Sequence, residues 1–156
     1  MNDVIEIWTD GSCNRINKLG GIGVYMRYKD HEMTIKKGYK NTKTGRMEIK
    51  AVIIALNAIT DRTKQIIIYS DSQYVVKSIT IWMMNWIHRG WIGVANIDLW
   101  KQFLQIYEKF DRNKIRFFHI KGHTEKEDRL SLGNAIVDKL ADYKKQKRYL
   151  ENDLIL

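Results

Sequence analysis

The sequence predicts an α/β fold in which one mixed β-sheet is covered by helices. Three observations support it: strand-like segments come first, a helical stripe of apolar residues follows, and two later strand-like segments are separated by helical ones. Strands joined through helices are expected to be parallel with right-handed crossovers. The first three strands are joined directly, so we expect them to form an antiparallel meander.

The first part of the chain supplies the meander. Residues 4–9 are rich in β-formers and end at Asp10-Gly11, a typical turn signal. Two further strands are predicted over residues 21–29 and 32–40, and the polar run between them favours a hairpin. From residue 46 to residue 59 the apolar side chains then repeat at helical spacing, which predicts the first long helix.

The second part alternates strands with helices. Residues 65–69 form a short, continuous apolar strand of the kind that is buried on both faces. Asp98 is expected to act as the N-cap of a helix with one apolar face. The remaining predicted elements are short helices over residues 72–80 and 81–89, a fifth strand over residues 114–120 and a last helix over residues 133–147.

Length and composition predict a single domain over residues 1–156, with residues 148–156 as a C-terminal tail. Hydrophobic residues make up 44% and charged residues 29%, a balance typical of soluble globular proteins. No apolar run approaches the length of a membrane span, and the N-terminus does not resemble a signal peptide. The single cysteine, Cys13, cannot form an intramolecular disulfide, which is consistent with a reducing cytoplasm. We therefore expect a cytoplasmic monomer.

The charge of the chain points to a polyanionic partner. Lysine and arginine total 27 against 18 aspartate and glutamate residues, which gives a net charge of +9 and a pI near 9.6. In a domain of this size, such an excess favours nucleic-acid binding over a merely solubilising role for the lysines.

Four carboxylates are predicted to meet at one edge of the sheet. Asp10 ends the first strand and Asp71 follows the fourth, so both lie at the same carboxyl edge if these strands are adjacent and parallel. Glu48 lies in the first turn of the first long helix, and Asp138 lies in the last helix. Each acid alone has an ordinary explanation as a turn, cap or surface residue. Together they would repel one another strongly, which favours a site for divalent cations such as Mg²⁺.

Five ordered motifs, spread between about residue 4 and residue 143, resemble those of the type 1, cellular class of ribonuclease H. They are Thr9-Asp10-Gly11-Ser12-Cys13, Gly45-Arg46-Met47-Glu48, Tyr69-Ser70-Asp71-Ser72-Gln73-Tyr74-Val75, Lys121-Gly122-His123 and Asn134-Ala135-Ile136-Val137-Asp138-Lys139-Leu140-Ala141. The segment between Trp86 and Trp91, together with Asp98-Leu99-Trp100, is also similar to the substrate-binding handle of that family. The resemblance implies a five-stranded mixed sheet, three strands antiparallel and two parallel, flanked by helices.

The resemblance also implies an activity, namely hydrolysis of the RNA strand of an RNA–DNA hybrid with two Mg²⁺ ions, for which Mn²⁺ is a plausible substitute. The products would carry 5′-phosphate and 3′-hydroxyl ends. Asp10, Glu48, Asp71 and Asp138 match the catalytic acids that hold the metals in the family. His123 matches a loop histidine that assists proton transfer and product release. Two further residues, Gln73 and Asn134, match positions that hold the active site and the substrate.

The chain departs from the family pattern at three places on the expected substrate surface. The turn that begins at Asn14 lacks the usual proline, and Thr42 and Thr44 stand near positions where relatives often carry two asparagines. The handle is short and has few basic residues, with Arg89 among its polar tips. We expect Trp91 to contact the DNA strand. The helical spacing of Trp82, Trp86 and Trp100 favours their being core residues. The resemblance to the handle also makes Trp86 a candidate for contact with the substrate.

Two charged segments near the end of the chain carry further expectations. The loop between His123 and Asp138 is expected to position His123 without adding a metal ligand. The basic cluster made by Lys144, Lys145, Lys147 and Arg148 is expected to be a solvated helix end rather than a set of phosphate contacts.

Three other functions compete with hybrid cleavage. A catalytically silent nucleic-acid-binding module would be expected to have lost one of the four acids, and none is lost here. A junction resolvase or integrase-like nuclease would share the acids but lack the Lys-Gly-His motif and the tryptophan-rich handle. A plain basic scaffold leaves the four positioned acids unexplained.

Overall fold

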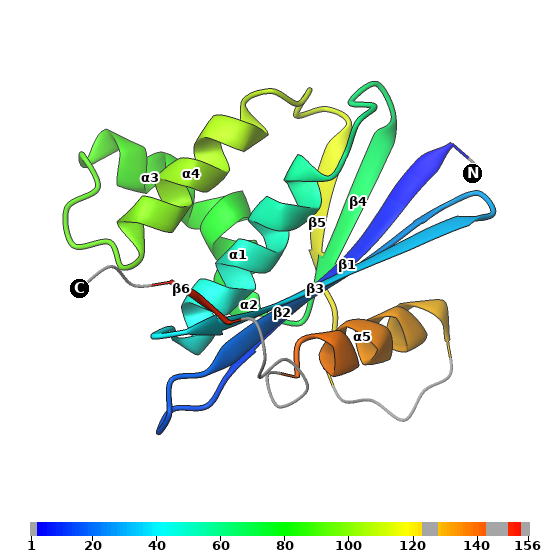
Figure 1. Cartoon of the computed structure of the whole chain (residues 1–156). Helices are drawn as coiled ribbons and strands as arrows, with labels where there is room; N and C mark the ends of the chain where they lie inside the picture. The colour runs from blue at the N-terminus through cyan, green and yellow to red at the C-terminus, as the bar shows by residue number, and fades with distance from the viewer. Residues whose placement is uncertain (1–2, 123–127, 143–149, 154–156) are drawn as a thin grey trace.

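A computed structural model describes residues 3–122, 128–142 and 150–153, which form a six-stranded sheet in the order β5-β4-β1-β2-β3-β6 (Figure 1). The strands are β1 (Val4–Cys13), β2 (Gly20–Tyr28), β3 (His31–Lys40), β4 (Gln65–Ser70), β5 (Ile115–His119) and β6 (Leu150–Asn152). The helices are α1 (Thr44–Asn57), α2 (Gln73–Lys77), the π-helix η1 (Ser78–Trp82), α3 (Met83–His88), α4 (Ile97–Tyr107) and α5 (Arg129–Leu140).

The predicted topology is confirmed for the five main strands. Strands β1, β2 and β3 form the antiparallel meander, and β4 lies parallel to β1 and to β5. Because Thr9 pairs with Ser70, the carboxyl ends of β1 and β4 lie side by side. The sixth strand, β6, was not expected, and it adds three residues in parallel to the outer edge of β3.

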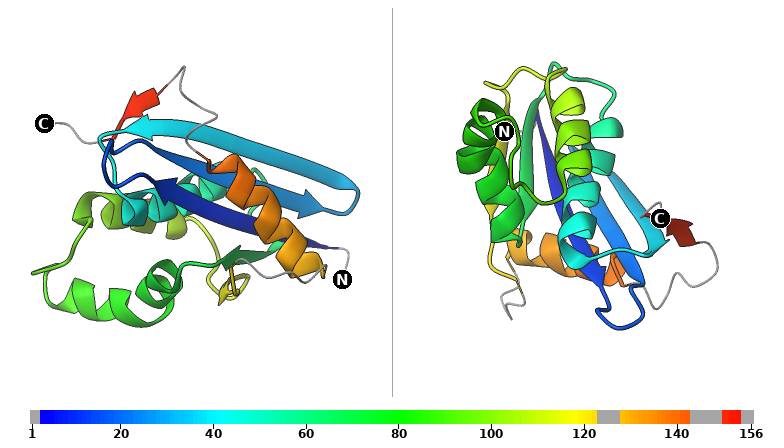
Figure 2. Two further views of the ribbon diagram at one scale, coloured as in Figure 1. Left: turned by 90° about the horizontal axis from the view of Figure 1, so that it is seen from below. Right: turned by 90° about the vertical axis from the view of Figure 1, so that its left-hand side faces the viewer.

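Helices cover both faces of the sheet, as the two views in Figure 2 show. Alternation along β1 sends Ile7 into the main core with α1 and α4, whereas Trp8 points to the other face. There Trp8 packs with Tyr25, Tyr69 and Val137 of α5. Asp10 follows Trp8 by two residues and therefore shares the α5 face. No helix in the described part of the chain is long and apolar enough to span a membrane.

The end of β1 differs from the prediction. Strand pairing continues past the expected turn at Asp10-Gly11, with Gly11 opposite Ile22 on β2. The glycine serves a close approach instead: a Cβ built on Gly11 would lie 2.3 Å from the carbonyl carbon of Met47 and 2.4 Å from the backbone nitrogen of Glu48. Gly11 thus lets the start of α1 rest directly on β1.

Two predicted helix starts are also wrong. Helix α4 begins after Asn96, whose left-handed φ of 60° ends the preceding turn, and the Asp98 carboxylate binds Arg46 instead of capping the helix. Helix α5 begins at Arg129, four residues before the expected start, because the Asp128 side chain accepts a hydrogen bond from Ser131 N and caps it. This helix ends at Leu140, and residues 143–147 of the predicted helix lie outside the described residues.

The stretch expected to form two short helices is one continuous helical run. Helix α2 passes through the π-helix η1 into α3 without an intervening loop. The Thr80 hydroxyl donates to the carbonyl of Val76 at 2.7 Å, four residues earlier. The wider π turn changes the direction in which the following side chains point.

Gly11→Ala is expected to destabilise the protein by about 1–3 kcal/mol or more, because the added methyl group must displace backbone atoms of α1. Gly45→Ala is the matched control, since its Cβ would meet nothing closer than Tyr74 at 3.5 Å. Alanine is also favoured over glycine in a helix by about 1 kcal/mol. Urea unfolding of both variants measures the difference, and equal midpoints would show that the close approach at Gly11 is unimportant.

Candidate active site

Three of the four predicted acids converge at the carboxyl edge of the sheet. Asp10 comes from β1, Asp71 directly follows β4, and Glu48 lies in the first turns of α1. Each offers a carboxylate oxygen, and these oxygens lie within 4.8 Å of one another. Acids from three separate elements thus form one group, as the sheet topology predicts.

The fourth acid, Asp138, reaches the group from the other face of the sheet. Its carboxyl group is close enough to Asp10 to hydrogen-bond with it, although it lies outside the tight group of three. Helix α5 is held there by Gly133, where a Cβ would lie 2.3 Å from the indole of Trp8, and by the Ser12 hydroxyl, which donates to Ala141 O at 2.5 Å. Asp10 therefore has acids on both sides.

Burial and repulsion strongly disfavour ionisation of the inner acids. Desolvation raises the pKa of Asp10 to about 8, and the nearby charges of Asp71 and Asp138 add to the effect. The pKa of Glu48 is also raised well above its ordinary value, first by burial and then by Asp10 and Asp71. The N–H of Gly11 donates to Asp10 Oδ1 at 2.9 Å and offsets only part of this cost.

The acid group fits a divalent cation. Within the described residues, Oε2 of Glu48 is buried without a hydrogen-bond partner, and Asp10 is 5% exposed. A hard cation would supply the missing partner and the missing positive charge at once, and would bring the carboxylates back to their ionised form. Asp10, Glu48, Asp71 and Asp138 are the residues placed to hold it.

Two predicted supporting residues lie beside the acids. Asn134 lies one turn before Asp138 on α5, is 6% exposed, and has an Oδ1 without a hydrogen-bond partner among the described residues. Gln73 is exposed at the first position of α2, two residues after Asp71. Asn134 is therefore placed to support the site from within, and Gln73 to meet a bound molecule.

The proline-free turn is organised by Asn14. Its side-chain oxygen accepts hydrogen bonds from the backbone N–H groups of Ile16 and Asn17, at 2.9 and 3.1 Å. An asparagine side chain that hydrogen-bonds the backbone two residues on stabilises a turn. Asn14 therefore shapes this loop.

The two threonines before Glu48 have different environments. Thr44 is exposed at the first position of α1, as a substrate contact requires. Thr42 is 1% exposed, and its hydroxyl donates to Asp153 Oδ2 at 2.8 Å, so it supports the loop from inside instead. Beside them lies a hollow of about 620 Å³ that is lined by Cys13, Arg15, Lys18, Thr42, Lys43 and Thr44.

The handle is an aromatic stack. Trp86 lies 5.8 Å from Trp100 and 6.3 Å from Trp91 between ring centroids, and Trp100 is fully buried. Trp82 was expected in the core, but it is 39% exposed at the last position of the π-helix η1. Trp91, at a φ of 66°, is half-buried under Lys101, and Arg89 is exposed.

His123 and the basic cluster at residues 144–148 lie outside the described residues. The backbone just before His123 passes close to the acids, since a Cβ on Gly122 would lie 2.7 Å from Oδ2 of Asp71. A second histidine, His119, was not predicted, and its Nε2 lies 3.1 Å from the backbone oxygen of Asp71. Its place at the end of β5, beside β4, is the signal that would have identified it.

Comparisons with known proteins agree with this geometry. The RNase H family model matches residues 2–146. Ribonuclease HI of Haemophilus influenzae is 42% identical over 146 residues, covering 90% of this chain and 89% of that protein. Ribonuclease H of Actinobacillus succinogenes is 39% identical over 157 residues, covering 97% and 96%.

Solved structures share the fold at lower identity. LC9-RNase H1, described as a type 1 RNase H with the type 2 active-site motif, superposes with a TM-score of 0.75 at 23% identity, covering 90% of this chain and 71% of that chain. The PFV RNase H domain in solution gives a TM-score of 0.73 at 24% identity, covering 88% and 91%. These two likenesses support the architecture alone.

Asp10→Asn is expected to stabilise the metal-free protein, and increasingly so as the pH rises from about 4 to about 8. The unfolded carboxyl ionises near 3.8 and the folded one near 8, so the parent loses stability across this window while the neutral amide does not. With EDTA present, the Tm of the variant should exceed that of the parent at pH 8 by roughly 3–10 °C. Adding Mg²⁺ should raise the Tm of the parent more than that of the variant.

Asp30→Asn makes the same substitution at an exposed carboxylate in the hairpin turn, outside the acid group, and serves as the matched control. A Tm difference between Asp10→Asn and the parent that stays constant from pH 4 to pH 8 would contradict the account of repulsion within the acid group.

Proposed function

Because the chain belongs to the ribonuclease H family, we propose that it cleaves the RNA strand of RNA–DNA hybrids internally, leaving 5′-phosphate and 3′-hydroxyl ends. The observation that carries the proposal is the group of carboxylates at the sheet edge of a chain with a net charge of +9. A basic surface attracts a polyanion, whereas the carboxylates alone would repel it. The carboxylates must therefore be neutralised before a nucleic acid can approach them.

Two Mg²⁺ ions, for which Mn²⁺ can substitute, are the proposed cofactors. Bound there, they would neutralise the acids, activate a water molecule for in-line attack on phosphorus and stabilise the leaving 3′ oxygen. Asp10 lies within 4.8 Å of Asp71 and Glu48 on one side and within hydrogen-bond reach of Asp138 on the other, which makes it the best placed residue to serve both ions. The nucleophile is water, so the reaction uses no serine or cysteine of the chain.

The other residues of the site have supporting roles in this proposal. Asn134 holds the acids from the α5 side, and Gln73 contacts the substrate from the start of α2. His123, which follows the glycine packed on Asp71, assists proton transfer and product release. The charged loop after His123 adds no metal ligand.

The hybrid would lie across the hollow beside Thr44 and reach the handle. Arg15, Lys18 and Lys43 offer positive charge around this hollow, and Asn14 fixes the backbone of its rim. Further along, Arg89 and the aromatic groups of Trp86 and Trp91 face the second strand. Contacts to the 2′-hydroxyl distinguish RNA from DNA in such a complex.

The proposal includes a single cytoplasmic domain that acts as a monomer. The family match over residues 2–146 extends along nearly the whole chain, which supports one domain. Sedimentation equilibrium with and without a hybrid oligonucleotide measures the oligomeric state.

The direct test offers Mg²⁺ and end-labelled RNA–DNA hybrid, duplex RNA, duplex DNA or single strands to the protein. Cleavage should be confined to the RNA strand of the hybrid, and Asp10→Asn should bind the hybrid while its rate falls by about a thousandfold or more, as expected when transition-state charge loses its stabilisation. The parent protein should also cleave the hybrid when Mn²⁺ replaces Mg²⁺.

The alternatives give different results in the same assay. Equal cutting of duplex DNA would favour the junction resolvase or integrase-like class, and binding without any cutting would favour a silent module. An Asp10→Asn variant that cuts at the parental rate would show that the acid group is not the active site.

The weakly basic handle should limit affinity. Ile92 is 79% exposed beside Trp91, so Ile92→Lys is expected to lower the KM for hybrid by roughly two- to fivefold at low salt, in line with one added phosphate contact. The gain should shrink as salt rises. Met33→Lys adds the same charge at the start of β3, far from the acids, and serves as the control. Equal KM values for the two variants would show that the handle does not contact the hybrid.

A further inference from the structure

The C-terminal segment of the described chain is built into the surface proposed to bind nucleic acid. Strand β6 pairs with the end of β3, and the N–H of Asp153 donates to Lys40 O at 3.0 Å. Next to it, Asn41 Nδ2 donates to Asn152 Oδ1 at 2.8 Å. The segment therefore runs alongside the stretch that leads from β3 into α1.

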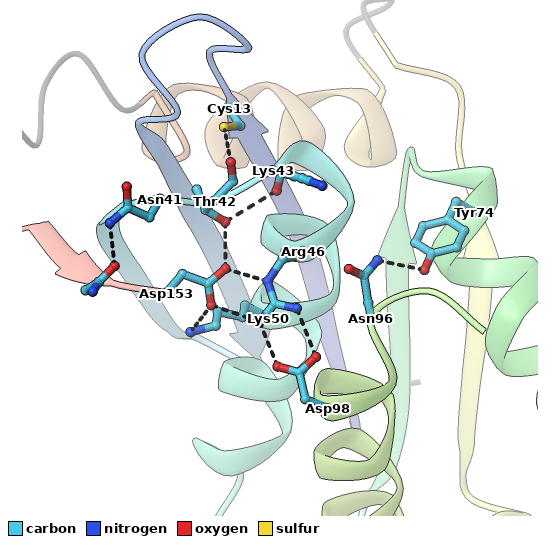
Figure 3. A network of polar contacts seen from close by, with 11 residues as sticks. Cys13, Asn41, Thr42, Lys43, Arg46, Lys50, Tyr74, Asn96, Asp98 and Asp153 are labelled. Atoms are coloured by element: carbon cyan, nitrogen blue, oxygen red, sulfur yellow. Dashed lines mark hydrogen bonds and ion pairs between the residues drawn. The ribbon is translucent and has the colours of Figure 1, made fainter. Parts of the chain in front are cut away.

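The Asp153 carboxylate lies at the centre of these contacts, as Figure 3 shows. Its side chain is 0% exposed, and Oδ2 accepts hydrogen bonds from the Thr42 hydroxyl at 2.8 Å and from Arg46 Nε at 2.7 Å. Oδ1 pairs with Lys50 Nζ at 2.9 Å. Three side chains from the loop and from α1 thus converge on one carboxylate from the tail.

Arg46 extends this network to the handle. Two of its nitrogens bind the two carboxylate oxygens of Asp98 at 2.8 and 2.9 Å, at the start of α4. The Arg46 side chain is 7% exposed, whereas that of Asp98 is 65% exposed. One buried guanidinium of α1 therefore binds both the tail and the base of the handle, and Asp153 connects it to the Thr42 loop.

The charges in this network depend on one another. Burial alone would raise the pKa of Asp153, but the hydrogen bonds from Arg46, Lys50 and Thr42 hold it below its ordinary value. The carboxylate is therefore ionised between two cations. Removing a carboxylate from such a group leaves buried positive charge without its partner, which disturbs the segments that carry it.

We propose that Asp153 is a positioning residue for hybrid binding, which fixes the loop from Thr42 to Thr44 in the conformation that presents its exposed side chains to the nucleic acid. Thr42 is the link: its hydroxyl donates to Asp153, and its carbonyl accepts from Cys13 Sγ at 3.4 Å in the wall of the hollow. The Asp153 side chain is itself buried, and its hydrogen bonds and ion pairs go to Thr42, Arg46 and Lys50. The inference rests on the proposed function, because the loop matters only if this surface binds the hybrid.

The experiment compares Asp153→Asn and Asp153→Ala with Glu151→Gln, all in the full chain. Glu151 lies in the same strand and pairs with the exposed Lys37, so its variant removes the same charge without touching the loop. We expect the KM for hybrid to rise about tenfold in the Asp153 variants, as expected for a displaced binding loop, with kcat within about twofold of the parent. The Glu151 variant should match the parent in both.

Direct binding separates positioning from general loss of fold. The same substitutions placed in Asp10→Asn allow the Kd for uncut hybrid to be measured, and every assay is run at least 15 °C below the Tm of the variant, a margin at which nearly all molecules are folded. The Kd should rise about tenfold for the Asp153 variants, in parallel with their KM.

Three results would overturn the inference: a KM and Kd in the Asp153 variants equal to those of Glu151→Gln, a fall in kcat at unchanged KM, or a lower Tm with unchanged hybrid affinity. If the parent does not cut the hybrid at all, the proposed function fails instead. The binding measurement still decides the role of Asp153 in that case.

Discussion

Mutual repulsion among buried carboxylates is the constraint on which the rest of this structure depends. Asp10 and Glu48 are almost fully buried beside two further acids, and the pKa of Asp10 is raised to about 8. Such a group persists only if the elements that carry it cannot move apart. Close packing of the helices on the sheet holds these elements together. Gly11 packs against α1 on one face of the sheet, and Gly133 of α5 packs against Trp8 on the other. Both helices are thus held against β1, and the scaffold bears the strain that a bound cation would relieve.

Much of this arrangement could be predicted from the sequence. The acids of the site can be predicted because hydrophobic patterns show where strands end. Adjacent parallel strands then bring their carboxyl ends together. The predictions of local structure are wrong where a residue makes a contact with a distant part of the chain. Asp10-Gly11 has the composition of a turn, yet the glycine is needed for contact with a helix 36 residues away in sequence, at Met47. Asp98 has the composition of a cap, yet a buried arginine competes for its carboxylate.

The role of the tail could not be predicted for a related reason. Strand β6 has only three residues and carries no alternating pattern, and Asp153 resembles any polar residue near an end. Its importance comes wholly from partners that the fold brings to it. The handle illustrates the same limit, because the π-helix that ends at the exposed Trp82 has no composition signal of its own. Tertiary partners, which local sequence does not encode, decide the details of the substrate surface.

The contact between Thr42 and Asp153 has a consequence for the order of folding. These residues are 111 positions apart in sequence, so their hydrogen bond closes a loop that contains most of the domain. Contacts at such separation cost more chain entropy than those within a hairpin or a helix, and they form late. The group of Asp10, Glu48 and Asp71 needs only β1, α1 and β4, and its members are at most 61 positions apart. Asp138 is 128 positions from Asp10, so it would join them about as late as Asp153 joins Thr42. A folding chain would therefore bring three of its acids together before it adds both the fourth acid and the surface that delivers substrate.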